Sequence, residues 1–168
     1  MTVSEYNQCV DKYADSLFRY CVGLVYSSSD ADDLVQESFM RLWEHRKKID
    51  QKAAKNWLYK TAYRAMIDRY RKSKRENNFR NDQVERSLDT YQNIEHKDLI
   101  MRSLDVLNPA QRNLILLRDY EGYAYKELCE LTGMSMTNVK VTLFRSRKKL
   151  REEMRKLSSD ISKIRRND

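Results

Sequence analysis

The stretch YKELCELTGMSMTNVKVTLFRSRKKL, residues 125–150, decides the fold predicted for this chain. Its apolar residues recur at helical spacing on both sides of the segment Thr132-Gly133-Met134-Ser135, whose composition is typical of a tight turn. Gly133 can adopt the positive φ that such a turn needs, and Cys129 is small enough for two helices to approach closely. The pattern predicts a helix-turn-helix.

The second helix of this pair is predicted to have two chemically different faces, with Ser135 as its N-cap. The expected buried side consists of Met136, Val139, Leu143, Ser146 and Leu150. Long cationic and apolar side chains on the opposite side suit base edges, phosphates and thymine methyl groups. The candidate contacts to duplex DNA are Met136, Thr137, Lys140, Val141, Phe144, Arg145 and Lys148. A helical hairpin that is basic without binding DNA is the structural alternative.

Upstream of this pair, the sequence predicts one more helix of the same unit. Asn108 and Pro109 are an N-cap followed by proline at the first helical position, and Gly122 is expected to end that helix. An apolar stripe precedes them at Leu99, Ile100, Leu104 and Leu107. We expect a second domain over residues 97–156 and a tail over 157–168.

The N-terminal part of the chain predicts three helices in a first domain, residues 1–75. Apolar residues of the first helix step by three and four at Tyr6, Val10, Tyr13, Leu17, Tyr20 and Leu24. Ser29 or Asp30 is expected to cap a second helix that runs through Trp43. A basic connector, residues 46–52, leads to a third helix from Lys55 to about Lys74. Residues 76–96 are polar and without periodicity, so they are predicted to form a flexible linker.

Positive charge is concentrated in two blocks of the chain. The 168 residues carry a net charge of +8, with a sequence pI near 9.4. Residues 41–75 hold thirteen basic and three acidic side chains, and residues 140–156 hold eight and two, whereas residues 1–40 are acidic. Two separate basic blocks indicate two contacts with a polyanion such as nucleic acid.

The first basic block covers the third helix, whose outer face combines cations with an aromatic residue. Cations follow phosphates and aromatic faces hold unstacked bases, a combination that suits melted DNA. The candidate residues are Lys52, Asn56, Trp57, Lys60, Arg64, Arg71 and Lys72. Exposed lysine and arginine are also common on helices that bind nothing.

Composition narrows the fold class to an all-α protein of two small helical domains. Three scattered glycines and one proline are too few for the turns of a β-sandwich or for a phosphate-binding glycine loop. Three widely spaced cysteines and two histidines indicate neither a disulfide framework nor a metal site. There is no signal peptide and no long apolar run, so a cytoplasmic protein without membrane insertion is expected, with no cofactor and no catalytic residues.

The order of motifs closely resembles the extracytoplasmic-function class of bacterial sigma factors. The resemblance covers about residues 5–155 and rests on DADDLVQESFMRLW (30–43), WLY (57–59), DRYRK (68–72), LNPAQR (107–112), the helix-turn-helix and FRSRKKL (144–150). It implies a protein that binds core RNA polymerase, directs it to particular promoters and helps to open the duplex, without catalysis of its own. An autonomous helix-turn-helix regulator is the rival interpretation, and a nucleic-acid-processing enzyme would lack a credible site.

The resemblance also implies a role for each helix. The second helix would dock on the clamp coiled coil of the polymerase β′ subunit through an exposed stripe of Asp33, Gln36, Glu37 and Met40, and the β flap would be a further contact. The third helix would read the minus-ten element and the helix-turn-helix the minus-thirty-five element. An anti-sigma factor is an expected partner. Arg64 stands where many relatives have asparagine, and Val141 where serine is frequent, so the promoter sequence does not transfer from relatives.

Overall fold

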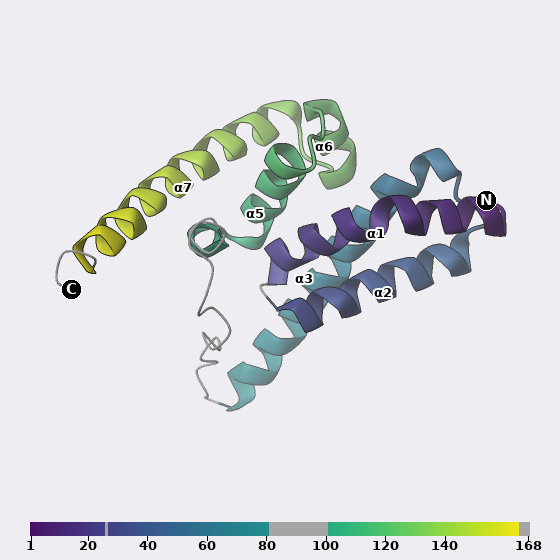
Figure 1. Cartoon of the computed structure of the whole chain (residues 1–168), viewed down its shortest axis with the longest axis horizontal. Coiled ribbons are helices and arrows are strands. Elements are labelled where there is room, and N and C mark those ends of the chain that lie inside the picture. The colour runs from purple at the N-terminus through teal and green to yellow at the C-terminus, as the bar shows by residue number, and fades with distance from the viewer. Residues whose placement is uncertain (26, 81–100, 165–168) are drawn as a thin grey trace.

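The computed structural model describes residues 1–25, 27–80 and 101–164, with side chains described for 1–25, 27–75 and 101–159. Every element of these ranges is helical (Figure 1), so the predicted all-α class is confirmed. The α-helices are α1 (Val3–Val25), α2 (Ser28–His45), α3 (Ala54–Arg80), α5 (Pro109–Ile115), α6 (Tyr125–Thr132) and α7 (Met136–Ile164). Short segments complete them: η1 (Gln51–Ala53), η2 (Leu104–Val106) and the π-helical η3 (Leu116–Tyr120).

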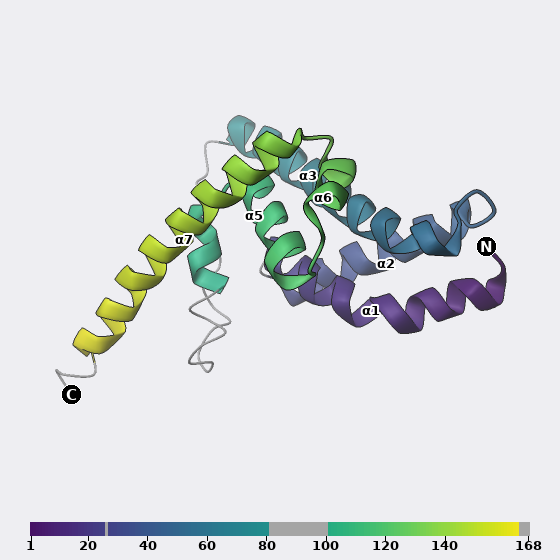
Figure 2. The same ribbon diagram turned by 90° about the horizontal axis from the view of Figure 1, so that it is seen from above.

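Helices α1, α2 and α3 pack side by side around an apolar centre (Figures 1 and 2). The predicted stripe of α1 faces it, with Leu17, Tyr20 and Leu24 buried and the N-terminal half of the stripe half-buried. From the other two helices come fully buried leucines such as Leu34 and Leu58. This burial of one face per helix is what holds the three amphipathic helices together.

The start of α2 differs from the prediction by two or three residues. Ser27, with an extended backbone (φ −113°, ψ 124°), is the N-cap, and its side-chain oxygen accepts the N–H of Asp30 at 3.2 Å. The prediction of Ser29 or Asp30 as the cap is therefore wrong, because both lie inside the helix. A run of three serines and an aspartate offers several possible caps, and the packing of Ala31 and Leu34 selects the first.

The third helix is longer than its apolar pattern indicates. Asp50 caps η1, where its carboxylate accepts the N–H of Lys52 at 2.9 Å, and α3 follows directly and continues to Arg80. Lysine, arginine and glutamate are good helix formers, so a solvent-exposed helix can continue beyond the end of its apolar stripe. The remainder of the predicted linker, residues 81–96, and the predicted Leu99 and Ile100 lie outside the described residues.

The caps predicted for the second domain are confirmed. Asn108 and Gln111 form a reciprocal capping box of 2.9 and 3.2 Å at the start of α5. Gly122 and Gly133 have φ of 74° and 73°, and Ser135 accepts the N–H of Asn138 at 3.2 Å at the start of α7. These bonds satisfy backbone groups that a helix end leaves open. Met136 is 40% exposed, so its prediction as a buried residue is wrong; at the first position of α7 it lies before the buried stripe begins.

The two helical units are in contact with each other. Helices α5 and η3 lie against α1, and α6 lies against α3, while the C-terminal part of α7 extends away from both (Figure 2). Gly23 of α1 packs tightly against the second unit: a Cβ atom at this position would lie 2.7 Å from Cδ2 of Leu116. Any larger residue at position 23 would therefore require the Leu116 side chain to shift.

Candidate nucleic-acid interface

The outer face of α7 is exposed along its whole predicted extent. Lys140, Arg145 and Lys148 are solvent-exposed, and Phe144 is 71% exposed, an unusual value for so large an apolar side chain. The opposite side is closed, with Val139, Leu143 and Ser146 among its buried residues. The Ser146 hydroxyl donates to the Thr142 carbonyl at 2.7 Å, which satisfies its polar group within the helix. Helix α7 thus presents a basic face with apolar atoms to solvent.

A network of charged and aromatic side chains fixes α7 against the unit that carries it. Arg147 donates two hydrogen bonds to Asp119, from Nη2 at 2.6 Å and from Nε at 3.1 Å. This bidentate pair raises the pKa of the Arg147 guanidinium. The Tyr125 ring, at the start of α6, has the Arg118 guanidinium 4.7 Å and the Lys140 ammonium 5.9 Å from its centroid.

Sequence reasoning missed Asp119, Arg147 and Tyr125. Arg147 and Asp119 are 28 residues apart, on different elements, and no spacing rule joins them. The bidentate Arg147–Asp119 pair and the two cations near the Tyr125 ring can be recognised only when the positions of α6 and α7 are known.

The candidate residues for melted DNA are distributed over η1 and α3. Lys52, Arg64, Arg71 and Lys72 are exposed, whereas Asn56, Trp57 and Lys60 are half-buried. The Trp57 ring lies 5.9 Å from the ring of His45, at the C-terminal end of α2. The structure therefore gathers Asn56, Trp57 and Lys60 along one part of α3, with Lys52 just before it and Arg71 and Lys72 more than two turns beyond.

Two of these residues border a cleft between the units. The cleft has a volume of about 480 Å³, and α3 contributes Tyr59, Lys60, Tyr63 and Arg64 to its lining. The other wall comes from α5, η3, the end of α6 and the turn that follows it: Ala110, Asn113, Leu117, Glu130, Leu131, Thr132, Gly133 and Met134. Lys60 and Arg64 therefore share a confined space with the helix-turn-helix.

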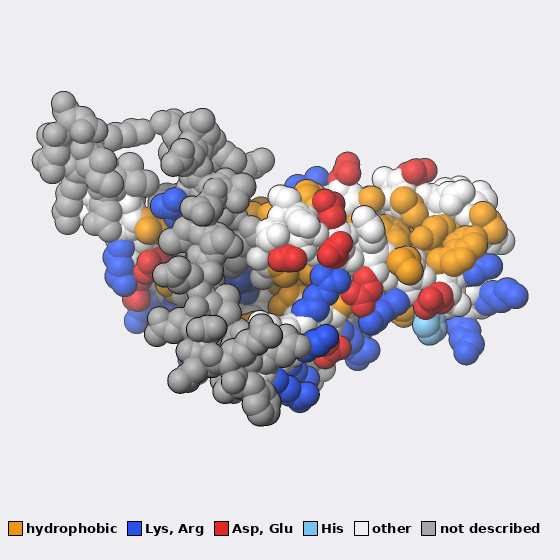
Figure 3. All heavy atoms as spheres, turned by 90° about the horizontal axis from the view of Figure 1, so that it is seen from below, with side chains coloured by type: hydrophobic (Ala, Val, Ile, Leu, Met, Phe, Trp, Pro, Cys, Tyr) orange, Lys and Arg blue, Asp and Glu red, His pale blue; other side chains and the backbone are white. Residues whose placement is uncertain are grey.

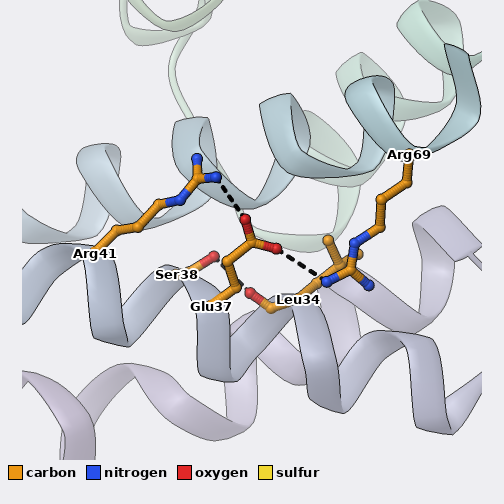
Figure 4. Close-up of polar contacts among 5 residues, drawn as sticks. All are labelled: Leu34, Glu37, Ser38, Arg41 and Arg69. Atoms are coloured by element: carbon orange, nitrogen blue, oxygen red, sulfur yellow. Dashed lines mark hydrogen bonds and ion pairs between the residues drawn. The ribbon is translucent and has the colours of Figure 1, made fainter. Parts of the chain in front are cut away.

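The predicted stripe of α2 is exposed at Asp33, Gln36 and Met40, and Met40 is 64% exposed. Glu37 differs from these neighbours because its carboxylate is already paired. It binds Arg41 at 2.6 Å and Arg69 of α3 at 2.9 Å, with its side chain 29% exposed (Figure 4). The two guanidinium groups offset the negative charge of Glu37. The remaining negative charge of the stripe is that of Asp33.

The surface around α2 mixes both signs of charge with apolar side chains. Seen from the lower side of Figure 1, acidic and basic side chains intermingle, and hydrophobic ones gather toward the end where the chain begins (Figure 3). Trp43, in the last turn of α2, is 37% exposed, and the Arg46 guanidinium lies 3.8 Å from its ring centroid. Tryptophan and methionine are enriched at protein interfaces, and Trp43 and Met40 are both exposed on this helix.

The described ranges contain neither a metal-binding cluster nor a membrane-spanning helix. No group of three histidine, cysteine, aspartate or glutamate side chains in the described ranges could hold a metal ion. None of the helices described is both long enough and apolar enough to cross a membrane. The three cysteines are free thiols.

Family comparisons match both helical units. The model of sigma-70 region 2 matches residues 9–76, and the model of sigma-70 region 4 matches residues 97–150. The match to the first unit disfavours an autonomous helix-turn-helix regulator, which would leave that unit without a role.

Curated relatives cover nearly the whole chain. The RNA polymerase sigma-E factor of Streptomyces coelicolor is 32% identical over 155 residues, 90% of this chain and 87% of the relative. The sigma-E factor of Streptomyces antibioticus is 30% identical over 99% of this chain and 93% of the relative. The ECF RNA polymerase sigma factor SigM of Bacillus subtilis is 29% identical, over 90% and 94%.

Solved structures share the fold. The sigma factor RpoE of Bartonella quintana, in complex with the anti-sigma factor NepR, has a TM-score of 0.77 at 22% identity, over 91% of this chain and 98% of that chain. CnrH in complex with the cytosolic domain of CnrY has a TM-score of 0.64, also at 22% identity, over 88% and 85%. Sigma factors are non-enzymatic regulators of transcription. On these matches, the chain belongs to the extracytoplasmic-function class of the sigma-70 family, whose members bind core RNA polymerase and direct it to specific promoters.

Proposed function

We propose that this sigma factor divides its work among three surfaces: the α2 stripe docks on polymerase, the α3 face holds melted promoter DNA, and the α7 face reads duplex DNA upstream. One observation carries the proposal most strongly. The face of α7 that follows the Gly133 turn is basic, apolar and exposed, while the opposite face is closed. A helix of this kind fits the major groove.

On the upstream duplex, Lys140 and Arg145 would donate hydrogen bonds to base edges or phosphates. Val141 and Phe144, exposed between them, would contact thymine methyl groups. Met136 and Thr137, in the first turn, and Lys148, one turn beyond Phe144, would extend the contact along the groove. The bidentate Arg147–Asp119 pair supports this assignment, because it orients α7 without using the outer face.

On the downstream side, the α3 face would bind the strand that is unpaired when the promoter opens. Arg71 and Lys72 are free to follow phosphates, while Asn56 and Trp57 border the connector from α2. Removing a base from the stack costs a few kcal/mol, and binding both promoter elements from one chain can offset that cost.

Docking on polymerase would use Asp33, Gln36 and Met40, with Glu37 as the residue that orients α2 against α3. The exposed Met40 and Trp43 supply apolar area, and Asp33 suits a basic partner helix such as the β′ clamp coiled coil. The second domain would contact the β flap. Since the structural relative RpoE is bound to the anti-sigma factor NepR, we propose an anti-sigma partner for this chain too, action in the cytoplasm, where polymerase works, and no catalytic activity.

A crossover experiment tests these assignments. Holoenzyme is titrated with an upstream duplex fragment and, separately, with a single-stranded fragment of the minus-ten element. Arg145→Ala is expected to weaken binding of the duplex only, and the double change Arg71→Ala with Lys72→Ala to weaken binding of the single strand only. Arg19→Ala, an exposed charge on α1, is the matched control. Equal effects of both changes on both fragments would contradict the assignment of duplex DNA to α7 and of melted DNA to α3.

A further inference from the structure

We propose that α7 makes a second contact with upstream DNA beyond its reading face: Arg151 and Arg155 bind the phosphate backbone beside the groove that α7 reads. This contact is independent of the base sequence. It deepens the function proposed for α7 and rests on it. The match to sigma-70 region 4 ends at residue 150, so both arginines lie beyond the matched part of the chain.

The two arginines belong to a continuation of the reading helix. Helix α7 runs unbroken from Met136 to Ile164, and its C-terminal part extends away from both helical units (Figure 2). Glu153 and Lys156 form an ion pair of 3.4 Å across one turn of this part, whose lysine, arginine and glutamate residues are good helix formers. These local features stabilise the helix where it leaves the body, so its side chains keep defined directions.

The arginines lie on the same face as the proposed duplex contacts. Arg151 follows Phe144 by seven residues, and Arg155 follows Lys148 by seven. At 3.6 residues per turn, seven residues return a side chain to within about 20° of the same direction. Both arginine side chains are exposed. The face of α7 that is proposed to read DNA therefore continues as a cationic face beyond residue 150.

The cations of this part of α7 differ in whether they are already paired. Arg147 binds Asp119 through two hydrogen bonds, and Lys156 pairs with a glutamate one turn before it. Within the described part of the chain, neither Arg151 nor Arg155 has an ion pair or a hydrogen bond from its side chain. These two guanidinium groups can therefore bind phosphate oxygens without breaking an internal contact.

The length of α7 places these residues at the edge of the groove. At 1.5 Å per residue, the proposed reading surface from Met136 to Lys148 is about 18 Å long, whereas the major groove is about 12 Å wide. Because the groove winds around the duplex and the helix is straight, the turns after Lys148 leave the groove and pass the backbone at its edge. Arg151 and Arg155, about 6 Å apart along the helix axis, lie in those turns.

A phosphate contact at this place has a defined consequence. Phosphates are the same at every base pair, so the contact carries no sequence information and instead fixes the orientation of the protein on the duplex. Each phosphate that a cation neutralises releases counterions, which adds about 0.9 to the steepness of the log–log dependence of affinity on salt. The extension of α7 therefore adds affinity and orientation to the reading of the upstream element.

The test uses holoenzyme assembled from the full chain and titrated with two duplexes of equal length over a range of salt concentrations. One duplex carries the upstream element and the other a scrambled sequence. We expect Arg151→Ala and Arg155→Ala each to weaken binding of both duplexes by the same factor and to lower the steepness of the salt dependence by about 0.9. Alanine favours the helix, so the fold is retained.

Two further variants make the test specific. Arg151→Lys should keep most of the affinity, because lysine binds phosphate as a point charge. Lys149→Ala is the matched control, since it removes one positive charge from an exposed position about 160° around the helix from Arg151, and it should leave the salt dependence unchanged. An unchanged salt dependence in both arginine-to-alanine variants, or weakening confined to the duplex with the upstream element, would overturn the proposal.

Arg145→Ala, measured on the same duplexes, separates this inference from the proposed function. If Arg145→Ala weakens binding of the upstream element while Arg151→Ala and Arg155→Ala bind as the wild type does, the reading face stands and the phosphate contact is wrong. If Arg145→Ala has no effect, the reading face itself is wrong. Weaker association of the Arg151 and Arg155 variants with core polymerase, with unchanged duplex binding, would assign the arginines to an acidic protein surface and overturn the proposal.

Discussion

Glu37 of α2 and Arg69 of α3 form an ion pair of 2.9 Å that joins two helices of the first domain, and Arg41 completes the pair on the other carboxylate oxygen at 2.6 Å. A residue expected from its helical position to face a partner is thereby also part of the internal packing (Figure 4). Substitutions on this stripe must therefore be interpreted with both roles in mind.

We expect Glu37→Lys to weaken association with core polymerase and to lower stability, because it places a third cation beside Arg41 and Arg69. Loss of a partly exposed pair costs about 1 kcal/mol or less in the free energy of unfolding, and like-charge repulsion adds to it. Asp33→Lys changes the same net charge on an exposed residue and should weaken polymerase binding alone. Urea unfolding and co-purification with core polymerase measure the two effects. Normal polymerase binding by Asp33→Lys would contradict the docking stripe.

Lys140→Ala and Arg145→Ala should each weaken recognition of the upstream duplex by about 1–3 kcal/mol, the range for a good contact to a base edge. The reason is the exposure of both side chains on the outer face of α7. Run-off transcription from a promoter that depends on its upstream element measures the loss. Transcription equal to the wild type by both variants would refute these assignments.

Tyr125 is expected to position Lys140 for that contact. Both Arg118 and Lys140 lie within 6 Å of its ring centroid, and a cation–π contact is worth about 0.5–1 kcal/mol at an exposed site. Tyr125→Leu should weaken upstream binding, Tyr125→Phe should restore most of it, and the effects of Tyr125→Leu and Lys140→Ala should not add. Full additivity in a double-mutant cycle would show that the ring acts independently of Lys140.

Stability should fall in alkaline solution, in part because of one buried thiol. Burial raises the pKa of Cys21 to about 12 from an ordinary value of 9.0, so the folded state keeps a proton that the unfolded state loses first. The stabilisation is complete below pH 9 and is lost as the pH rises toward 12. Cys21→Ala should flatten the decline in the free energy of unfolding between about pH 9 and 10, measured by urea titration. An identical slope in both proteins would contradict this account.

Local signals in the sequence correctly predicted the helix ends that depend on a specific capping residue or on a glycine. Asn108-Pro109 and Gly133 define their ends because a cap or a positive φ depends on one or two residues. The two faces of α7 follow from periodicity except at Met136, the first residue of the helix, which is exposed. The N-cap of α2 was not predicted correctly, because Ser27, Ser28 and Ser29 are locally equivalent and tertiary packing chooses among them.

Contacts between distant segments had no signal in the sequence. Tyr20 and Asn113 are 93 residues apart, and the apolar stripe that predicts burial of Tyr20 does not indicate its partner. Gly23 looks like a weak helix residue until Leu116 is placed against it. Periodicity predicts which face of a helix is apolar but not which neighbour covers that face. The contact between the two helical units could therefore be recognised only in the three-dimensional structure.

Reconstitution of this chain with core RNA polymerase tests the central claim most directly. Transcripts made from genomic DNA by core polymerase, with and without the chain, are mapped at their 5′ ends. We expect the chain to produce a defined set of start sites that share two upstream elements, at the minus-ten and minus-thirty-five positions, and core polymerase alone to produce none of them. The claim would be contradicted if the chain failed to associate with polymerase and left the pattern of start sites unchanged.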